Sequence, residues 1–199
     1  FIASKSFRGD IIGIEKQYKS YNYAIKNSKP DLIYISLPNS KHFYWAKKSL
    51  NNNCHTIVDK PITSNLNELK SLIQIAKKKK KLLSESTFFN YHSQVQKLIK
   101  IYKKNKLNNI FAKFIIPMPE KKSILLSRNL GGGVLMDMGP YISAIPRIFN
   151  LKKIITKNIV IKKNNKKIIT FIKFRIKFKD CTYNGIFKFG GKYKNQIEI

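Results

Sequence analysis

Three short segments of the chain carry side chains that could perform chemistry. Residues 37–42 read Leu-Pro-Asn-Ser-Lys-His, residues 59–61 read Asp-Lys-Pro, and residues 131–141 hold three glycines, a carboxylate and a phenol. On a helix, Asp137 and Tyr141 are four residues apart and therefore share a face. A carboxylate and a phenol on one face, opposite a lysine at the end of a strand, could bind a hydroxyl group and exchange a proton with it.

The second of these segments places a lysine directly after the apolar run 55–58, which predicts a buried strand. An ammonium group at the exit of a buried strand costs free energy unless it has a partner or a function. Taken alone, Asp59 and Lys60 also fit an ordinary surface turn, and residues 37–42 fit a strand-to-helix turn in which Asn39 or Ser40 caps the helix. Glycines 131–133 alone are weak evidence for a phosphate-binding loop, because no strand precedes them and no Gly-Lys-Ser/Thr follows.

Residues 1–87 alternate short apolar runs with stretches of helical spacing. We expect strands at 1–4, 31–36, 55–58 and 82–87, and helices over about 40–50 and 65–81. The run at 31–36 is continuously apolar, which is typical of a strand buried on both faces. This repetition predicts a parallel α/β unit with crossover helices.

Residues 88–199 have a different pattern. A helix is expected at about 93–104, a strand at 109–116, a Gly-rich start and then a helix at 131–150, and strands at 153–163, 167–179 and 182–189. Asn164-Asn165 is suited to a hairpin turn. These elements predict an α+β unit on a mostly antiparallel open sheet with one face packed and the other in water.

The composition narrows the function classes. The 199 residues include 36 lysines and 4 arginines against 10 acidic residues, giving a formal net charge of +30. Arginine is the usual reader of phosphates and base edges, whereas a lysine excess beside many Ile and Asn residues is typical of AT-rich codon usage. We therefore expect no nucleic-acid partner, and no membrane partner either, because no apolar run approaches about 18 residues.

Other features bear on the compartment and on the extent of the chain. Cys54 and Cys181 cannot form a disulfide framework, so a reducing cytoplasm is expected, and there is no His/Cys cluster suited to zinc. No signal peptide is recognisable at the start. The chain begins without Met and ends in the middle of an alternating pattern, so we interpret it as an internal fragment of a longer protein.

Together, in this order and at these spacings, the three segments resemble the Gfo/Idh/MocA oxidoreductases, the glucose-fructose oxidoreductase and inositol dehydrogenase family. Its members carry a Thr-Pro-Asn-x-x-His-like segment, then Glu-Lys-Pro after the next strand, then a Gly-Gly-Gly…Asp-x-Gly-x-His/Tyr helix. The resemblance implies that residues 1–87 are part of an NAD(P)-binding Rossmann domain whose first strand and Gly-rich loop lie before Phe1. Residues 88–199 would be part of a substrate-binding and oligomerisation domain.

The resemblance also implies an activity. The family transfers a hydride between nicotinamide and a carbinol or keto carbon of a sugar, nucleotide sugar or related polyol. Lys60 would be the catalytic lysine that hydrogen-bonds the reacting oxygen, and Tyr141 would donate or accept the proton. Asp137 would fix substrate hydroxyls or orient the site. A homo-oligomer formed through the C-terminal sheet would also be in keeping with the family.

The cofactor would be NADP or NAD. The implied cofactor-binding residues are Ser4, Lys5, Leu37, Pro38, Asn39, His42, Asp59, Lys60 and Pro61. At Ser4 and Lys5 a hydroxyl and a cation replace the acidic residue that reads the ribose 2′-hydroxyl in NAD enzymes, which favours NADP.

The chain departs from the family pattern at several places. Asp59 replaces the usual Glu, Leu37 replaces the common Thr, and residues 90–92 read Asn-Tyr-His where many members have an Arg.

Two other hypotheses stay open at this point. The charge of +30 would also suit a protein that binds nucleic acid or an anionic surface, although no nucleic-acid-binding motif accompanies it. A non-catalytic relative of the family would keep the fold without the chemistry. The retention of Lys60, Asp137 and Tyr141 together argues against that alternative, because a binding protein needs no proton donor.

Overall fold

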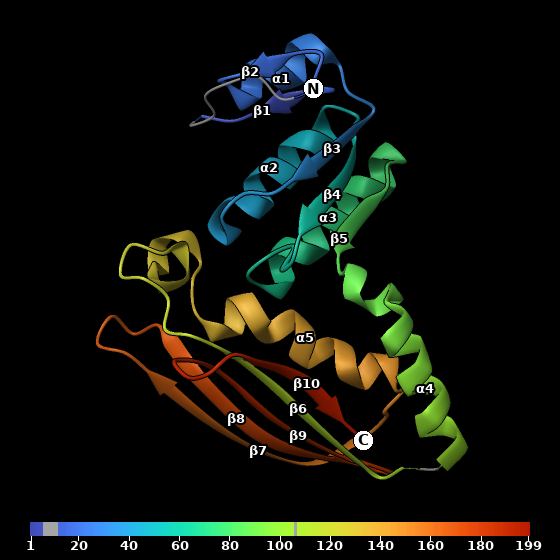
Figure 1. Ribbon diagram of the computed structural model, residues 1–199. Coiled ribbons are helices and arrows are strands. Elements are labelled where there is room, and N and C mark those ends of the chain that lie inside the picture. The colour runs from blue at the N-terminus through green and yellow to red at the C-terminus, as the bar shows by residue number, and fades with distance from the viewer. Residues whose placement is uncertain (6–11, 106) are drawn as a thin grey trace.

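The computed structural model describes residues 1–5, 12–105 and 107–199 and contains three sheets (Figure 1). β1 (Ile2–Ala3) and β2 (Gln17–Tyr18) form a parallel pair, and β3 (Leu32–Ile35), β4 (His55–Asp59) and β5 (Leu83–Ser86) form a parallel sheet in that order. The third sheet has the order β10-β6-β9-β8-β7. Its strands are β10 (Lys194–Glu198), β6 (Asn109–Ile116), β9 (Thr182–Phe189), β8 (Ile169–Phe178) and β7 (Ile154–Lys163).

The helices connect and cover these sheets. They are α1 (Tyr21–Ser28), α2 (Asn39–Asn51), α3 (Leu66–Lys79), α4 (Ser93–Asn105) and α5 (Val134–Ile148), with short 3-10 turns at Phe88–Tyr91, Ile124–Leu126 and Arg128–Leu130. The predicted parallel α/β unit followed by an α+β unit on a mostly antiparallel sheet is therefore confirmed. β10 is an additional strand that the sequence reasoning did not anticipate.

The sheet of β3, β4 and β5 is covered by helices on one face. Val58 and Thr56 of β4 are fully buried in the core that this sheet forms with α2 and α3, and Ile35 of β3 is 4% exposed. On the opposite face, Leu32 and Tyr34 are both more than half exposed. The prediction that residues 31–36 are buried on both faces is therefore wrong, because β3 is an edge strand whose second face carries no covering helix in the described structure.

The first turn of α2 also differs from expectation. The N-cap is Pro38, which makes no side-chain capping bond, so the prediction of Asn39 or Ser40 at that position is wrong. The helix begins one residue earlier, and the Asn39 side chain is used elsewhere, as described below. α3, by contrast, begins as its sequence suggests: the Asn65 side chain accepts a hydrogen bond of 3.0 Å from the Glu68 amide.

The five-stranded sheet packs one face against α5 (Figure 1). Along β9, buried and partly buried residues alternate without interruption, and Tyr183 and Phe187 are almost completely buried beneath α5. No helix of the described ranges covers the opposite face, and the edge strand β7 is exposed along its whole length. The expectation of an open sheet with one packed and one wet face is therefore confirmed.

Two separate hydrophobic clusters stabilise the described parts of the chain. One is built from residues between Ile33 and Leu83, and the other from residues between Leu98 and Ile199. The expected boundary between residues 87 and 88 falls between the two clusters and stays a prediction. None of the helices in the described ranges is long and apolar enough to cross a membrane.

Candidate active site

The structure brings Lys60 and Asp137 together from segments 77 residues apart. Lys60 directly follows β4, and Asp137 lies in the first turn of α5. The ammonium nitrogen of Lys60 donates to the Asp137 carboxylate at 2.8 Å and to the Asp137 backbone carbonyl at 2.6 Å. Both side chains are about one quarter exposed. The cation therefore has a partner and still reaches solvent, as a group that acts on a ligand must.

Tyr141 lies beside this pair, as its spacing from Asp137 predicts. The Lys60 nitrogen is 5.2 Å from the centre of the Tyr141 ring, which is within range for a cation–π contact. Phe89 and Phe114 hold the ring from two other sides, with centroid distances of 4.7 and 5.2 Å. The phenol thus has a fixed ring position next to the lysine, and neither phenylalanine was singled out by the sequence reasoning.

The segment 37–42 connects the other two segments. The Asn39 side-chain amide donates to the Gly131 carbonyl oxygen at 2.9 Å, which joins the start of α2 to the glycine loop. His42 is fully buried, and its Nδ1 and Nε2 lie 2.7 and 2.6 Å from the carbonyl oxygens of Pro61 and Leu37. His42 therefore offers no free ring nitrogen to a cofactor in this structure, and it fixes the turn that presents Lys60.

Glycine is required where the loop meets α2. A Cβ atom on Gly131 would lie 2.8 Å from the Asn39 Cβ, and one on Gly132 would lie 2.5 Å from the carbonyl oxygens of Ile124 and Leu125. Gly131 also has a φ of +75°, which favours glycine. The three glycines thus allow close packing of backbone rather than forming a phosphate loop.

Two carboxylates hold the turn around Lys60 from the sheet side. Glu85 of β5 accepts a hydrogen bond of 2.9 Å from the Ile62 amide, next to the cis Lys60-Pro61 peptide. Asp59 accepts a hydrogen bond from the Tyr34 hydroxyl, and this bond is the main reason why the pKa of Tyr34 is raised. Glu85 was missed by the sequence reasoning, although an acidic residue at a strand end is a usable signal in a chain with only 10 of them.

Ser4 and Lys5 follow β1, in the part of the molecule that lies far from α5 (Figure 1). The Ser4 amide donates to the Tyr18 carbonyl at 3.0 Å, and the Lys5 nitrogen is 6.0 Å from the centre of the Tyr21 ring. Their hydroxyl and ammonium groups thus lie at the carboxyl end of a parallel strand, as do Leu37 and Lys60 after β3 and β4. Open parallel sheets bind ligands at that edge.

The described chain is thus an α/β fold in which a parallel sheet precedes a mostly antiparallel sheet. Polar side chains follow the parallel strands, and the helix packed on the second sheet carries a carboxylate and a phenol. Residues 4–87 match the model of the Gfo/Idh/MocA oxidoreductase family, NAD-binding Rossmann fold. The resemblance to the Gfo/Idh/MocA oxidoreductases is therefore confirmed for this segment.

Curated relatives extend the similarity beyond residue 87. A dTDP-3,4-didehydro-2,6-dideoxy-alpha-D-glucose 3-reductase from Saccharopolyspora spinosa is 30% identical over 134 residues, which is 66% of this chain and 40% of that protein. D-xylose 1-dehydrogenase (NADP(+)) 2 from Haloferax volcanii is 24% identical over 74% of this chain and 46% of that protein. The chain thus spans less than half the length of these relatives.

Solved structures show the same fold. A 3-ketoreductase from Actinomadura kijaniata, in complex with NADP and TDP-benzene, matches with a TM-score of 0.82 at 20% identity, over 92% of this chain and 57% of that one. An aldose-aldose oxidoreductase from Caulobacter crescentus matches with a TM-score of 0.76 at 22% identity, over 86% of this chain and 55% of that one.

Proposed function

We propose that the whole protein is an NAD(P)-dependent oxidoreductase that transfers a hydride between nicotinamide and a carbinol or keto carbon of a sugar, nucleotide sugar or related polyol. The observation that carries this proposal is the cluster of Lys60, Asp137 and Tyr141, in which a half-buried ammonium contacts a carboxylate and the ring of a phenol. Two separate units of the chain contribute to it.

The described residues fit the cofactor by the chemistry of the groups that they present. The carboxyl edge of the parallel strands offers Ser4 and Lys5 at one place and the turns at Leu37-Pro38 and Lys60-Pro61 at others. A hydroxyl and an ammonium suit a ribose 2′-phosphate. The relatives include an enzyme named for NADP(+) and a ketoreductase solved with NADP, which supports NADP in preference to NAD. When bound, the cofactor supplies or accepts the hydride.

The chain's own residues would handle the oxygen of the reacting carbon. In the direction of ketone reduction, the carbon gains a hydride while its oxygen gains a proton. Lys60 would donate a hydrogen bond to that oxygen and stabilise the negative charge that develops on it. Tyr141 would deliver the proton from its hydroxyl group. Asp137 would orient Lys60, since the structure shows its carboxylate bonded to that ammonium.

The proposal is tested by titrating the whole protein with NADPH and NADH and following nicotinamide fluorescence. We expect saturable binding, tighter for NADPH. With a reducible sugar or nucleotide sugar, Lys60→Ala and Tyr141→Phe should each lower kcat by about 100-fold or more, while cofactor binding persists in Tyr141→Phe. Lys47→Ala, which removes an exposed lysine from α2, is the control. Absence of binding for both cofactors would refute the oxidoreductase assignment.

A further inference from the structure

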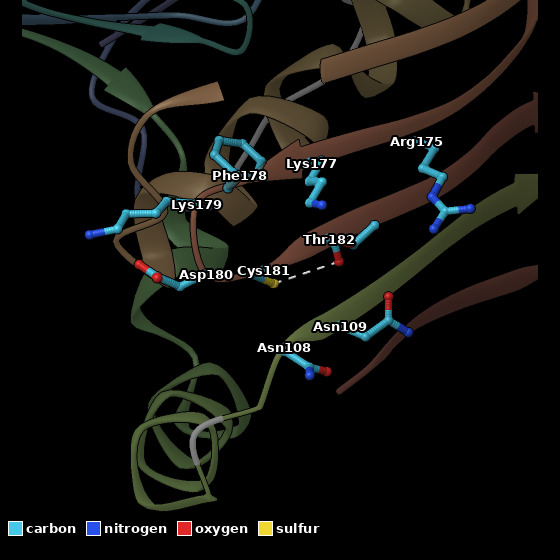
Figure 2. Close-up of a pocket in the computed structure, with 9 residues that line it drawn as sticks. All are labelled: Asn108, Asn109, Arg175, Lys177, Phe178, Lys179, Asp180, Cys181 and Thr182. Atoms are coloured by element: carbon cyan, nitrogen blue, oxygen red, sulfur yellow. Dashed lines mark hydrogen bonds between the residues drawn. The ribbon is translucent and has the colours of Figure 1, made fainter. Parts of the chain in front are cut away.

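A polar hollow lies on the five-stranded sheet, away from the candidate active site. Its volume is about 480 Å³, and it opens between the start of β6, the end of β8 and the start of β9 (Figure 2). The residues that line it are Asn108, Asn109, Arg175, Lys177, Phe178, Lys179, Asp180, Cys181 and Thr182. Its volume falls within the range of small-molecule sites, about 300–1,000 Å³.

The pairing of the strands places hydrogen-bond donors next to one another along the hollow. Lys177 of β8 pairs with Thr182 of β9, and Thr182 pairs with Asn109 of β6, so these three side chains form a row across neighbouring strands. Arg175 follows on the same face of β8, and Figure 2 shows Arg175 and Lys177 reaching toward the strand that carries Asn109. Because neighbouring strands are about 4.8 Å apart, this row spans about 10 Å. That distance suits a phosphate or diphosphate group.

The polar atoms around the hollow are mainly donors. The side-chain oxygen of Asn109 accepts a hydrogen bond of 2.9 Å from the Asn184 amide, which leaves the Asn109 amide nitrogen to donate. Neither Arg175 nor Lys177 forms an ion pair with a described residue. The carboxylate of Asp180 is directed away from both cations in Figure 2. An anion is therefore the complementary ligand.

The presence of an arginine at position 175 strengthens this argument. Only 4 of the 40 basic residues are arginines, so an arginine at a given surface position is not explained by the lysine bias of the chain. Its planar guanidinium can donate two parallel hydrogen bonds to the oxygens of a phosphate, which an ammonium cannot do.

We propose that this hollow binds the phosphate or diphosphate group of a small molecule through Arg175 and Lys177, assisted by Thr182 and Asn109. The site lies on the face of the sheet opposite α5, which carries Asp137 and Tyr141. It is therefore separate from the candidate active site and does not rest on the proposed function.

Titration of inorganic pyrophosphate into the whole protein at about 0.15 M ionic strength tests this proposal, because distant charges are then largely screened. We expect saturable binding that Arg175→Ala and Lys177→Ala each weaken by about tenfold. Arg175→Lys should weaken it less, since it keeps the charge and loses the fork. The amide NMR signals of Asn109 and Thr182 should shift on binding.

Lys173→Ala is the matched control, because Lys173 is exposed on the same strand and the same face and its loss changes the net charge equally. It should leave the affinity within twofold of the unmodified protein. An equal loss of affinity in Lys173→Ala and Arg175→Ala would overturn the proposal in favour of a diffuse charge effect. Absence of saturable binding would overturn it as well, and so would binding that Lys60→Ala abolishes and Arg175→Ala leaves intact.

Discussion

The contact between α2 and the glycine loop makes Gly131→Ala a sharp test of how the candidate site is assembled. The new methyl group would lie 2.8 Å from the Asn39 Cβ and 3.1 Å from the Ser40 amide nitrogen, so the helix and the loop must separate. Separation weakens the hydrogen bond from the Asn39 side chain to the Gly131 carbonyl oxygen. Neither neighbouring atom is the flexible end of a side chain, so the strain cannot be relieved by a rotamer change.

The expected loss of stability has three parts. An alanine at a φ of +75° costs about 1–2 kcal/mol, the overlap costs about 1–3 kcal/mol, and the weakened hydrogen bond costs about 1 kcal/mol. Gly13→Ala isolates the first part, because Gly13 has a φ of +81° and a Cβ added there would meet no atom of the described residues within 4 Å. Gly131→Ala should therefore lower the free energy of unfolding by about 2–4 kcal/mol more than Gly13→Ala does.

Urea denaturation of the whole protein, followed by circular dichroism, measures this difference between the two variants. Turnover should also fall in Gly131→Ala, because the loop leads into the helix that carries Asp137. Equal free energies of unfolding for the two variants would show that the loop and α2 are not tightly packed, and the account of the Asn39 contact would then be wrong.

Three further substitutions test other parts of the structure. His42→Phe removes the ring nitrogens that contact the carbonyl oxygens of Leu37 and Pro61 and should destabilise the protein by about 2–4 kcal/mol, measured by urea denaturation, with kcat reduced through the displaced Lys60 turn. Tyr183→Phe removes a buried hydroxyl that has no hydrogen-bond partner among the described residues, so the free energy of unfolding should stay equal or rise by about 1 kcal/mol. Burial raises the pKa of Tyr102 to about 12. Since an unfolded tyrosine ionises near pH 10, the folded state holds the proton longer, and stability should fall as the pH rises from about 10 to 12. Tyr102→Phe should make that fall shallower.

These substitutions have simple controls and refutations. Tyr44→Phe removes an exposed hydroxyl from the same helix as His42 and should leave stability within about 0.5 kcal/mol of the unmodified protein. A clear loss of stability in Tyr183→Phe would reveal a partner for that hydroxyl. A pH dependence above pH 10 that is unchanged in Tyr102→Phe would show that other groups control it.

Much of the fold follows from local sequence patterns. Partial alternation along residues 167–179 predicted one strand of the open sheet, and helical spacing after Asn65 predicted α3, because the period of apolar residues depends only on backbone geometry. β10 escaped this reasoning because Lys194–Glu198 is a short polar segment that becomes a strand through pairing with β6.

The exposure of β3 illustrates a second limit. Its sequence is apolar throughout, yet Leu32 and Tyr34 face away from the helices. Which face of a strand is covered depends on where the helices pack, and the strand's own residues do not specify that.

In the candidate site, too, some features follow from the sequence and others depend on the tertiary structure. The sequence by itself determined that Lys60, Asp137 and Tyr141 have the chemistry for proton transfer, and spacing placed the last two on one helix face. Only the tertiary structure decided that Asn39 and His42 hold the other two segments in place. A side chain's hydrogen-bond partner is whichever backbone group the fold brings within reach, and the partner of Asn39 lies 92 residues away along the chain.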